Sequence, residues 1–159
     1  VSHLMGFLNR TATLLNLGIK PVYIFDGESP ELKADELASR RARRDEAERV
    51  HKEALAAGDF ALAQKMAPRI MHYTQEMVDE TKQLLDLLGV PWVVAKAEGE
   101  GQAAVMAARG QLDVVATQDW DALLYGTPHL VRNLMSDGSK QHGRVVRAQM
   151  IDLDAMLES

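Results

Sequence analysis

The sequence predicts a layered α/β domain whose strands lie in a mainly parallel sheet. Short apolar runs alternate with segments in which apolar residues recur at helical spacing, an alternation typical of parallel sheets covered by helices. The chain has 159 residues, 47% hydrophobic and 26% charged, which is the composition of a globular domain. We therefore expect a single domain with a substantial core.

The first two expected elements are a helix and a strand. Apolar residues between 2 and 17 keep helical spacing, and Gly18 suits the left-handed conformation that ends many helices. Residues 21–25 form a continuous apolar run, which indicates a strand buried on both faces. Asp26 and Gly27 follow at its carboxyl end, where open α/β sheets bind their ligands.

Residues 30–74 are rich in charge and poor in apolar side chains. Basic and acidic residues nearly cancel along residues 31–53, which favours a solvated helix with ion pairs between successive turns. Within this segment, Arg40, Arg43 and Arg44 share one helical face, and such a face can bind phosphates.

The remaining elements continue the alternation. We expect helices at residues 61–66, 75–88, 100–109 and from Ile151 to Leu157, and strands at residues 91–95, 112–117, 129–134 and 144–147. Pro68 is expected to kink its segment or to begin a new helix. In this interpretation residues 1–29 and 75–159 form the core, and residues 30–74 are a helical insertion in the same domain.

Five carboxylates lie where predicted strands end or helices begin. They are Asp26, Glu98, Glu100, Asp119 and Asp121. Because the carboxyl ends of parallel strands meet at one edge of a sheet, the five could share a cleft, where their charges repel unless cations neutralise them. Mg²⁺ prefers oxygen ligands and usually takes one or two carboxylates per ion, so five acids suit two ions. Two such ions can stabilise the attacking water and the leaving oxygen of phosphodiester hydrolysis.

A purely structural interpretation of these acids stays open at this point. Glu98 and Glu100 at a helix start are stabilised by the helix dipole. Asp119 can cap the turn that leads into residues 121–124. Asp26 and the basic block at residues 40–44 favour metal binding over these alternatives when all the features are taken together.

Composition disfavours several classes of protein. The chain has no cysteine, which excludes a disulfide framework and a thiolate metal site, and its five histidines form no spaced ligand set. A net charge of -5 argues against a uniformly cationic nucleic-acid coat. No apolar run approaches the roughly 18 residues that span a bilayer, and no signal peptide opens the chain, so we expect an intracellular protein that does not bind a membrane.

The first residue is Val1, with Ser2 placed to cap a helix, and we therefore expect the chain to be a fragment.

Several motifs occur in an order that is specific to one nuclease family. They are Ser2-His3-Leu4-Met5-Gly6, Lys20-Pro21-Val22-Tyr23-Ile24-Phe25-Asp26-Gly27, Glu98-Gly99-Glu100 with Gln102-Ala103-Ala104, Gln118-Asp119-Trp120-Asp121-Ala122-Leu123-Leu124 and Leu130-Val131-Arg132-Asn133-Leu134. Along almost the whole chain they resemble flap endonuclease, especially its archaeal form. Gly101 stands where the family usually has Ala, and Trp120 stands where it often has Tyr or Met.

The resemblance implies a structure-specific 5′ nuclease of DNA replication and repair, with 5′-flap endonuclease and 5′-3′ exonuclease activity. It implies a three-layer, PIN-like parallel-sheet core crossed by a helical arch, and two-metal catalysis by Mg²⁺, for which Mn²⁺ can substitute. The implied partners are flap or branched DNA and, for the intact protein, the sliding clamp. The implied location is the cytoplasm of a prokaryote of archaeal type.

Position by position, the resemblance also assigns site residues. The acids around the first metal are matched by Asp26, Glu98 and Glu100, and Glu100 also reaches the second metal. Ligands of the second metal are matched by Asp119 and Asp121. Arch residues that contact the scissile phosphate are matched by Lys33 and Arg40, and basic arch positions that receive the flap strand by Arg43 and Arg44.

The family has parts that these 159 residues do not include. One metal-site Asp is expected upstream of Val1, and a last Asp, a helix-hairpin-helix element and the clamp-binding tail are expected beyond Ser159. We therefore expect little or no nuclease activity and weak duplex binding from these residues alone. The alternative is a non-catalytic DNA-binding fragment of the same core. A phosphatase that uses an acid-x-acid pair is disfavoured, because the pair at 119 and 121 lies late in the chain.

Overall fold

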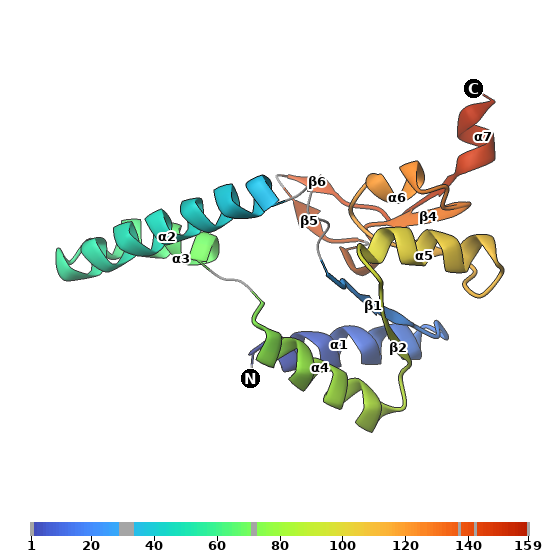
Figure 1. Cartoon of the computed structure of the whole chain (residues 1–159), viewed down its shortest axis with the longest axis horizontal. Coiled ribbons are helices and arrows are strands. Elements are labelled where there is room, and N and C mark those ends of the chain that lie inside the picture. The colour runs from blue at the N-terminus through green and yellow to red at the C-terminus, as the bar shows by residue number, and fades with distance from the viewer. Residues whose placement is uncertain (1, 29–33, 71–72, 137, 142, 159) are drawn as a thin grey trace. The chain divides into compact units, whose positions relative to one another are not determined.

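Figure 1 shows the computed structural model of the chain, which describes residues 2–28, 34–70, 73–136, 138–141 and 143–158. The chain forms two compact units. The first consists of Val1–Glu28 and Gln83–Ser159, and the second of Ser29–Lys82. None of the helices in these described ranges is long and apolar enough to cross a membrane.

The first unit contains three small groups of strands and the helices around them. Its elements are α1 (Ser2–Asn16), β1 (Tyr23–Phe25), β2 (Trp92–Val94), α5 (Gly99–Ala108), β3 (Val115–Ala116), α6 (Asp121–Leu124), β4 (His129–Arg132), η2 (Leu134–Ser136), β5 (Lys140–Gln141), β6 (Arg144–Val145), β7 (Gln149–Asp152) and α7 (Leu153–Leu157). Parallel pairs are formed by β1 with β2 and by β3 with β4, whereas β7 is antiparallel to β4.

Helix α1 packs on β1 in the first unit. The side-chain oxygens of Thr11 and Tyr23 share a hydrogen bond of 2.8 Å. The ring of Phe7 lies 5.5 Å from the ring of Tyr23, centroid to centroid. Gly18 ends the helix with a φ of 77°, as the sequence predicts. These contacts hold the strand from which Asp26 follows.

The core of the first unit lies between the helices α5 and α6 and the sheet formed by β3, β4 and β7. Its buried cluster consists of Ala103, Val115, Ala122, Leu123 and Leu130. Ile24 of β1 packs against this cluster. The β1–β2 sheet therefore shares a core with the separate sheet formed by β3, β4 and β7. Small alanine side chains allow α5 and α6 to approach closely.

The second unit is a helical hairpin. Helix α2 spans Ala34–Ala56 and α3 spans Phe60–Ile70. Gly58 has a φ of 74°, which only glycine adopts without strain, and it allows the chain to reverse between them. The two helices pack through buried side chains of small or flexible residues, namely Ala47, Ala54, Ala63 and Met66. Helix α4, Gln75–Leu88, follows the hairpin and continues into the first unit.

Most predicted elements are confirmed to within a few residues, but three predictions need correction. The expected parallel sheet is only partly present, since the described strands form separate small sheets, β7 is antiparallel to β4, and β5 and β6 are antiparallel to each other. The helix expected at residues 151–157 is confirmed at residues 153–157, but Ile151 and Asp152 belong to a strand, because the edge of β4 offers backbone partners to residues 149–152. Residues 144–145 form a hairpin with residues 140–141, not a sheet edge. For Pro68, which was expected either to kink its segment or to begin a new helix, the second outcome is ruled out, because Pro68 lies inside α3.

Candidate functional site

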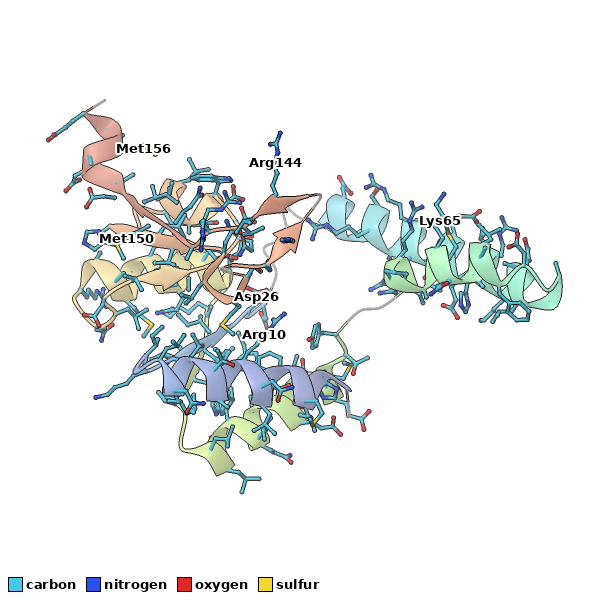
Figure 2. The ribbon with its side chains drawn as sticks, turned by 180° about the vertical axis from the view of Figure 1, so that it is seen from behind. Arg10, Asp26, Lys65, Arg144, Met150 and Met156 are labelled. Carbon is cyan, nitrogen blue, oxygen red and sulfur yellow. The ribbon has the colours of Figure 1, made fainter. Side chains whose placement is uncertain are left out.

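Asp26, which is labelled in Figure 2, follows the end of β1 and contacts the start of α5. Its Oδ1 accepts a hydrogen bond of 2.7 Å from the backbone N–H of Gly99. Gly99 is the first residue of α5, and the first N–H groups of a helix have no partner within the helix. Asp26 therefore caps α5 from a distant segment, and this bond brings two of the predicted acid-bearing segments together.

Gly27 allows the chain to pass close to the segment after β2. A Cβ at this position would lie 2.0 Å from the carbonyl oxygen of Ala95, so only glycine fits here. The N–H of Gly27 donates a hydrogen bond of 2.7 Å to the carbonyl of Ala97. The acid-Gly pair after β1 is thus fixed against residues 95–97, directly ahead of Glu98.

Glu98 links the start of α5 to the residue after α6. It is the N-cap residue of α5 but makes no side-chain capping bond. Its carboxylate instead accepts a hydrogen bond from the hydroxyl of Tyr125. The ring of Tyr125 also faces Gly101, where a Cβ would lie 3.5 Å from ring atoms. Tyr125 was not predicted as a site residue, since nothing in the spacing of the sequence places it beside Glu98.

The second acid pair lies on the turn between β3 and α6. The backbone N–H of Asp119 donates to Oγ1 of Thr117 at 3.1 Å, and Oδ1 of Asp119 accepts from the N–H of Asp121 at 3.0 Å. The expected capping role of Asp119 is therefore present. It does not exclude metal ligation, because a carboxylate has two oxygens with about four lone-pair sites.

The carboxylate oxygens of the five acids are the kind of ligand that Mg²⁺ prefers, but their side chains are not gathered around one point. In the described parts of the chain, no three His, Asp or Glu side chains form a group that could hold one metal ion. Carboxylates repel one another, and Asp26 and Glu98 are hydrogen-bonded to Gly99 and Tyr125. The donors are nevertheless hard oxygens, and Mg²⁺ is often held by only one or two carboxylates and several waters. Ligation by the five acids stays a prediction.

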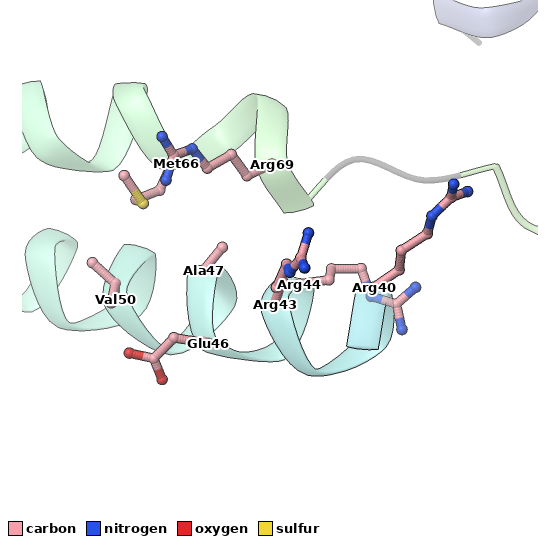
Figure 3. A pocket seen from close by; sticks show the side chains of 8 residues that line it. All are labelled: Arg40, Arg43, Arg44, Glu46, Ala47, Val50, Met66 and Arg69. Carbon is pink, nitrogen blue, oxygen red and sulfur yellow. The ribbon is translucent and has the colours of Figure 1, made fainter. Parts of the chain in front are cut away.

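A groove with four arginines lies in the second unit, between α2 and α3 (Figure 3). It has a volume of about 560 Å³. The lining residues are Arg40, Arg43, Arg44, Glu46, Ala47, Val50, Met66 and Arg69. The helical spacing thus correctly predicts that Arg40, Arg43 and Arg44 share a surface. The sequence analysis did not predict Arg69 of α3 as part of this surface, because no local spacing relates it to α2. Lys33, the other predicted phosphate contact, lies outside the described residues.

The charge of this groove is positive because four arginines line it against one acidic residue, and that residue is paired outside the groove. Glu46 accepts hydrogen bonds of 2.9 and 2.6 Å from the guanidinium of Arg49, which is itself outside the groove. These bonds lower the pKa of Glu46. Ala47, Val50 and Met66 supply an apolar wall beside the arginines. The groove can therefore bind an anion that also carries an apolar part.

Known proteins resemble the chain in both sequence and structure. Residues 1–47 match the XPG N-terminal domain family and residues 89–159 match the XPG I-region family. Flap endonuclease 1 of Pyrococcus furiosus is 49% identical over 140 residues, which cover 88% of this chain and 41% of that protein.

Two solved structures extend the likeness to the fold. Flap endonuclease-1 from Methanococcus jannaschii matches with 42% identity and a TM-score of 0.63, over 96% of this chain and 46% of that one. The catalytic core of Rad2 in complex with a DNA substrate matches with 27% identity and a TM-score of 0.68, over 99% of this chain and 41% of that one. The chain thus has a mixed α/β nuclease-core fold, and it spans about half the length of the curated relatives it matches.

Proposed function

This chain belongs to the flap endonuclease family, and from that premise we propose that it supplies the core of a structure-specific nuclease that hydrolyses DNA phosphodiesters with two Mg²⁺ ions. The proposed activities are 5′-flap endonuclease and 5′-3′ exonuclease, in DNA replication and repair. We assign the first unit to the three-layer, PIN-like core and the α2–α3 hairpin to the helical arch. The sliding clamp is a proposed partner of the intact protein, and an intracellular location stays an expectation.

The hydrogen bond between Asp26 and Gly99 is the observation that best supports a metal site. It joins the end of β1 to the helix start that carries Glu98 and Glu100. We propose that Asp26, Glu98 and Glu100 hold the first ion, with Glu100 also reaching the second. We propose Asp119 and Asp121 as the remaining ligands. When bound, the two ions would stabilise the attacking water and the leaving oxygen, and Mn²⁺ could replace Mg²⁺.

The arginine groove supports DNA as the substrate. Guanidinium groups bind phosphates through paired N–H donors, and an apolar wall suits the sugars and bases of a single strand. We propose that Arg43 and Arg44 receive the flap strand, and that Lys33 and Arg40 contact the scissile phosphate. The Rad2 core, one of the matching structures, was solved with a DNA substrate.

The groove also supports a second candidate function, DNA binding without cleavage. It is built wholly from residues of the second unit, so a single strand could bind there without any of the five acids. This candidate predicts that DNA binding is independent of Mg²⁺ and of Asp119. Both candidates predict binding that weakens steeply with salt, because phosphate contacts release counterions.

The test compares the 159-residue chain with Asp119→Asn and Arg43→Gln variants. Mg²⁺ is titrated by calorimetry, and binding and cleavage are followed on a labelled 5′-flap DNA. We expect Asp119→Asn to weaken Mg²⁺ binding at least about 10-fold, Arg43→Gln to weaken DNA binding, and cleavage by the unmodified chain to be slow. Equal Mg²⁺ affinity in the chain and in Asp119→Asn would show that the metal proposal is wrong. DNA binding without any Mg²⁺-dependent cleavage would favour the second candidate, and rapid cleavage would contradict the expected weak activity.

A further inference from the structure

Arg132 holds the turn that carries Asp119 and Asp121 at two points. Its Nε and Nη2 both donate to the carbonyl oxygen of Gln118, at 3.3 and 3.1 Å. The same guanidinium stacks on the ring of Trp120, with its Cζ 4.1 Å from the ring centroid. One side chain therefore contacts the residue before Asp119 and the residue after it.

The position of Arg132 is itself well fixed by the sheet. Arg132 is the last residue of β4, and the two residues before it, Leu130 and Val131, are buried. The backbone N–H of Thr117 donates to the carbonyl of Val131 at 3.2 Å, which extends the parallel pairing of β3 and β4 to the start of the turn. The guanidinium therefore projects from a rigid strand onto a turn that leaves the same sheet.

The chemistry of these contacts leaves the two carboxylates available to a cation. Among the described residues, Arg132 forms no ion pair with Asp119 or Asp121, and its donors are directed to a carbonyl and an aromatic face. A direct ion pair would neutralise a carboxylate and compete with a metal. An arginine stacked on an exposed tryptophan is a common surface contact. Arg132 does more, because its guanidinium also donates twice to the carbonyl of Gln118 and so restrains the path of the backbone.

We propose that Arg132 is a positioning residue, which sets the backbone of residues 118–121 so that the carboxylates of Asp119 and Asp121 are oriented for a divalent cation. This inference rests on the proposed function, because it concerns the proposed ligands of the second ion. Arg132 acts through Gln118 and Trp120 and does not touch the ion or the substrate. Groups that orient metal ligands typically change metal affinity by about 10- to 100-fold when they are removed.

The experiment uses Trp120 as its own reporter. The chain has two tryptophans, so Trp92→Phe leaves Trp120 as the only one and keeps an aromatic ring beside Phe25. In this background we compare Arg132→Met, which keeps the apolar stem, and Arg132→Lys, which keeps the charge but not the planar fork. Arg109→Met, at an exposed position just after α5, is the matched control.

Three quantities are measured for each variant: the thermal unfolding midpoint, acrylamide quenching of Trp120 without metal, and MgCl₂ affinity by calorimetry. We expect Arg132→Met to remain folded, to increase quenching about twofold, and to weaken Mg²⁺ binding by about 10- to 100-fold. Arg132→Lys should recover part of both effects, and Arg109→Met should match the background. Partial recovery by lysine is not expected from a general loss of folding.

Each contrary result has a distinct meaning. Unchanged quenching in folded Arg132→Met would show that Arg132 does not hold the turn, and increased quenching with unchanged Mg²⁺ affinity would show that the held turn does not orient the ligands. Either result would overturn the positioning role. If the background protein and Asp119→Asn bind Mg²⁺ equally, the proposed metal site fails, and the positioning role fails with it. That failure is recognised in Asp119→Asn, before any Arg132 variant is compared.

Discussion

Asp26 and Gly99 lie 73 positions apart in sequence and are joined by a hydrogen bond of 2.7 Å between a carboxylate and a helix N–H. The bond gives one acid two functions. It satisfies a donor that α5 leaves open, since Glu98 makes no capping bond of its own. It also holds the end of β1 beside the helix start that carries Glu100. Stability and the arrangement of the proposed metal ligands are therefore coupled at this position.

This coupling predicts different effects for two substitutions of Asp26. Asp26→Ala removes the acceptor and should lower the free energy of unfolding by about 0.5–2 kcal/mol, as the loss of an N-cap does. Asp26→Asn keeps an acceptor oxygen and should lower it by less. Urea denaturation in the presence of a chelator measures both without metal. Equal losses would show that the charge of Asp26 matters for stability and its hydrogen bond does not.

The glycines near the acids are predicted to respond in opposite directions to alanine. Gly27→Ala places a Cβ 2.0 Å from the Ala95 carbonyl, so the backbone must move, and we expect a loss of about 1–3 kcal/mol. Gly101→Ala meets the Tyr125 ring at an ordinary distance of 3.5 Å, inside α5. Alanine favours helix over glycine by about 1 kcal/mol, so this variant should be more stable than the original chain.

The same urea measurement compares the two glycine variants. Because both change Gly to Ala, their effects on the unfolded chain are alike. A difference between them therefore reports the folded structure. A Gly27→Ala variant as stable as the original chain would mean that the backbone at Gly27 does not approach the carbonyl of Ala95 closely.

Parts of this arrangement were predictable from the sequence because they depend on local pattern. The face shared by Arg40, Arg43 and Arg44 follows from helical periodicity, and the capping of residues 121–124 by Asp119 follows from its position before a short helix. Contacts between segments were not predictable in this way. The bond from Tyr125 to Glu98 and the stacking of Arg132 on Trp120 depend on how α5, α6 and β4 pack, which no local spacing records.

The wrong start of the helix expected at residues 151–157 has the same origin, since Ile151 and Asp152 belong to β7 and the helix begins at Leu153. Gln149-Met150-Ile151-Asp152 has no strong preference for helix or strand, and strand propensity depends heavily on context. The residues pair with β4, where His129 lies opposite Asp152 and Arg132 opposite Gln149. The partner strand therefore decided the conformation, and only the tertiary structure could show it.

A third prediction concerns the acidic titration of α2. The hydrogen bonds of Arg49 lower the pKa of Glu46 from its ordinary value of 4.5. Because the pKa is lower in the folded helix than in the unfolded chain, the stabilisation is fully present above about pH 4.5 and is lost as the pH falls through the folded value. Carboxyl ¹³C NMR should find Glu46 titrating below 4.5.

Two variants separate this effect from the general charge of the helix. Arg49→Gln should return the pKa of Glu46 toward 4.5. Lys52→Gln should change mainly Glu48, whose pKa is lowered by its hydrogen bond to Lys52. If both variants shift Glu46 equally, the specific Arg49 contact does not cause the lowered pKa.

The last prediction separates the arginine groove from the rest of the charged helix. Arg43 lines the groove, whereas its neighbour Arg41 does not, although both are exposed arginines of α2. If single-stranded DNA binds in the groove, Arg43→Gln should remove one phosphate contact and reduce the slope of log K against log salt by about 0.7. Arg69→Gln should act in the same way from α3, on the opposite side of the groove.

Arg41→Gln is the control for this prediction, because it removes one positive charge from the same helix but should leave the slope nearly unchanged. Fluorescence anisotropy with a labelled single strand, repeated over a range of KCl concentrations, measures all three slopes. Equal reductions for Arg41 and Arg43 would mean that DNA responds to the overall charge of α2, and the groove would then have no special role in binding.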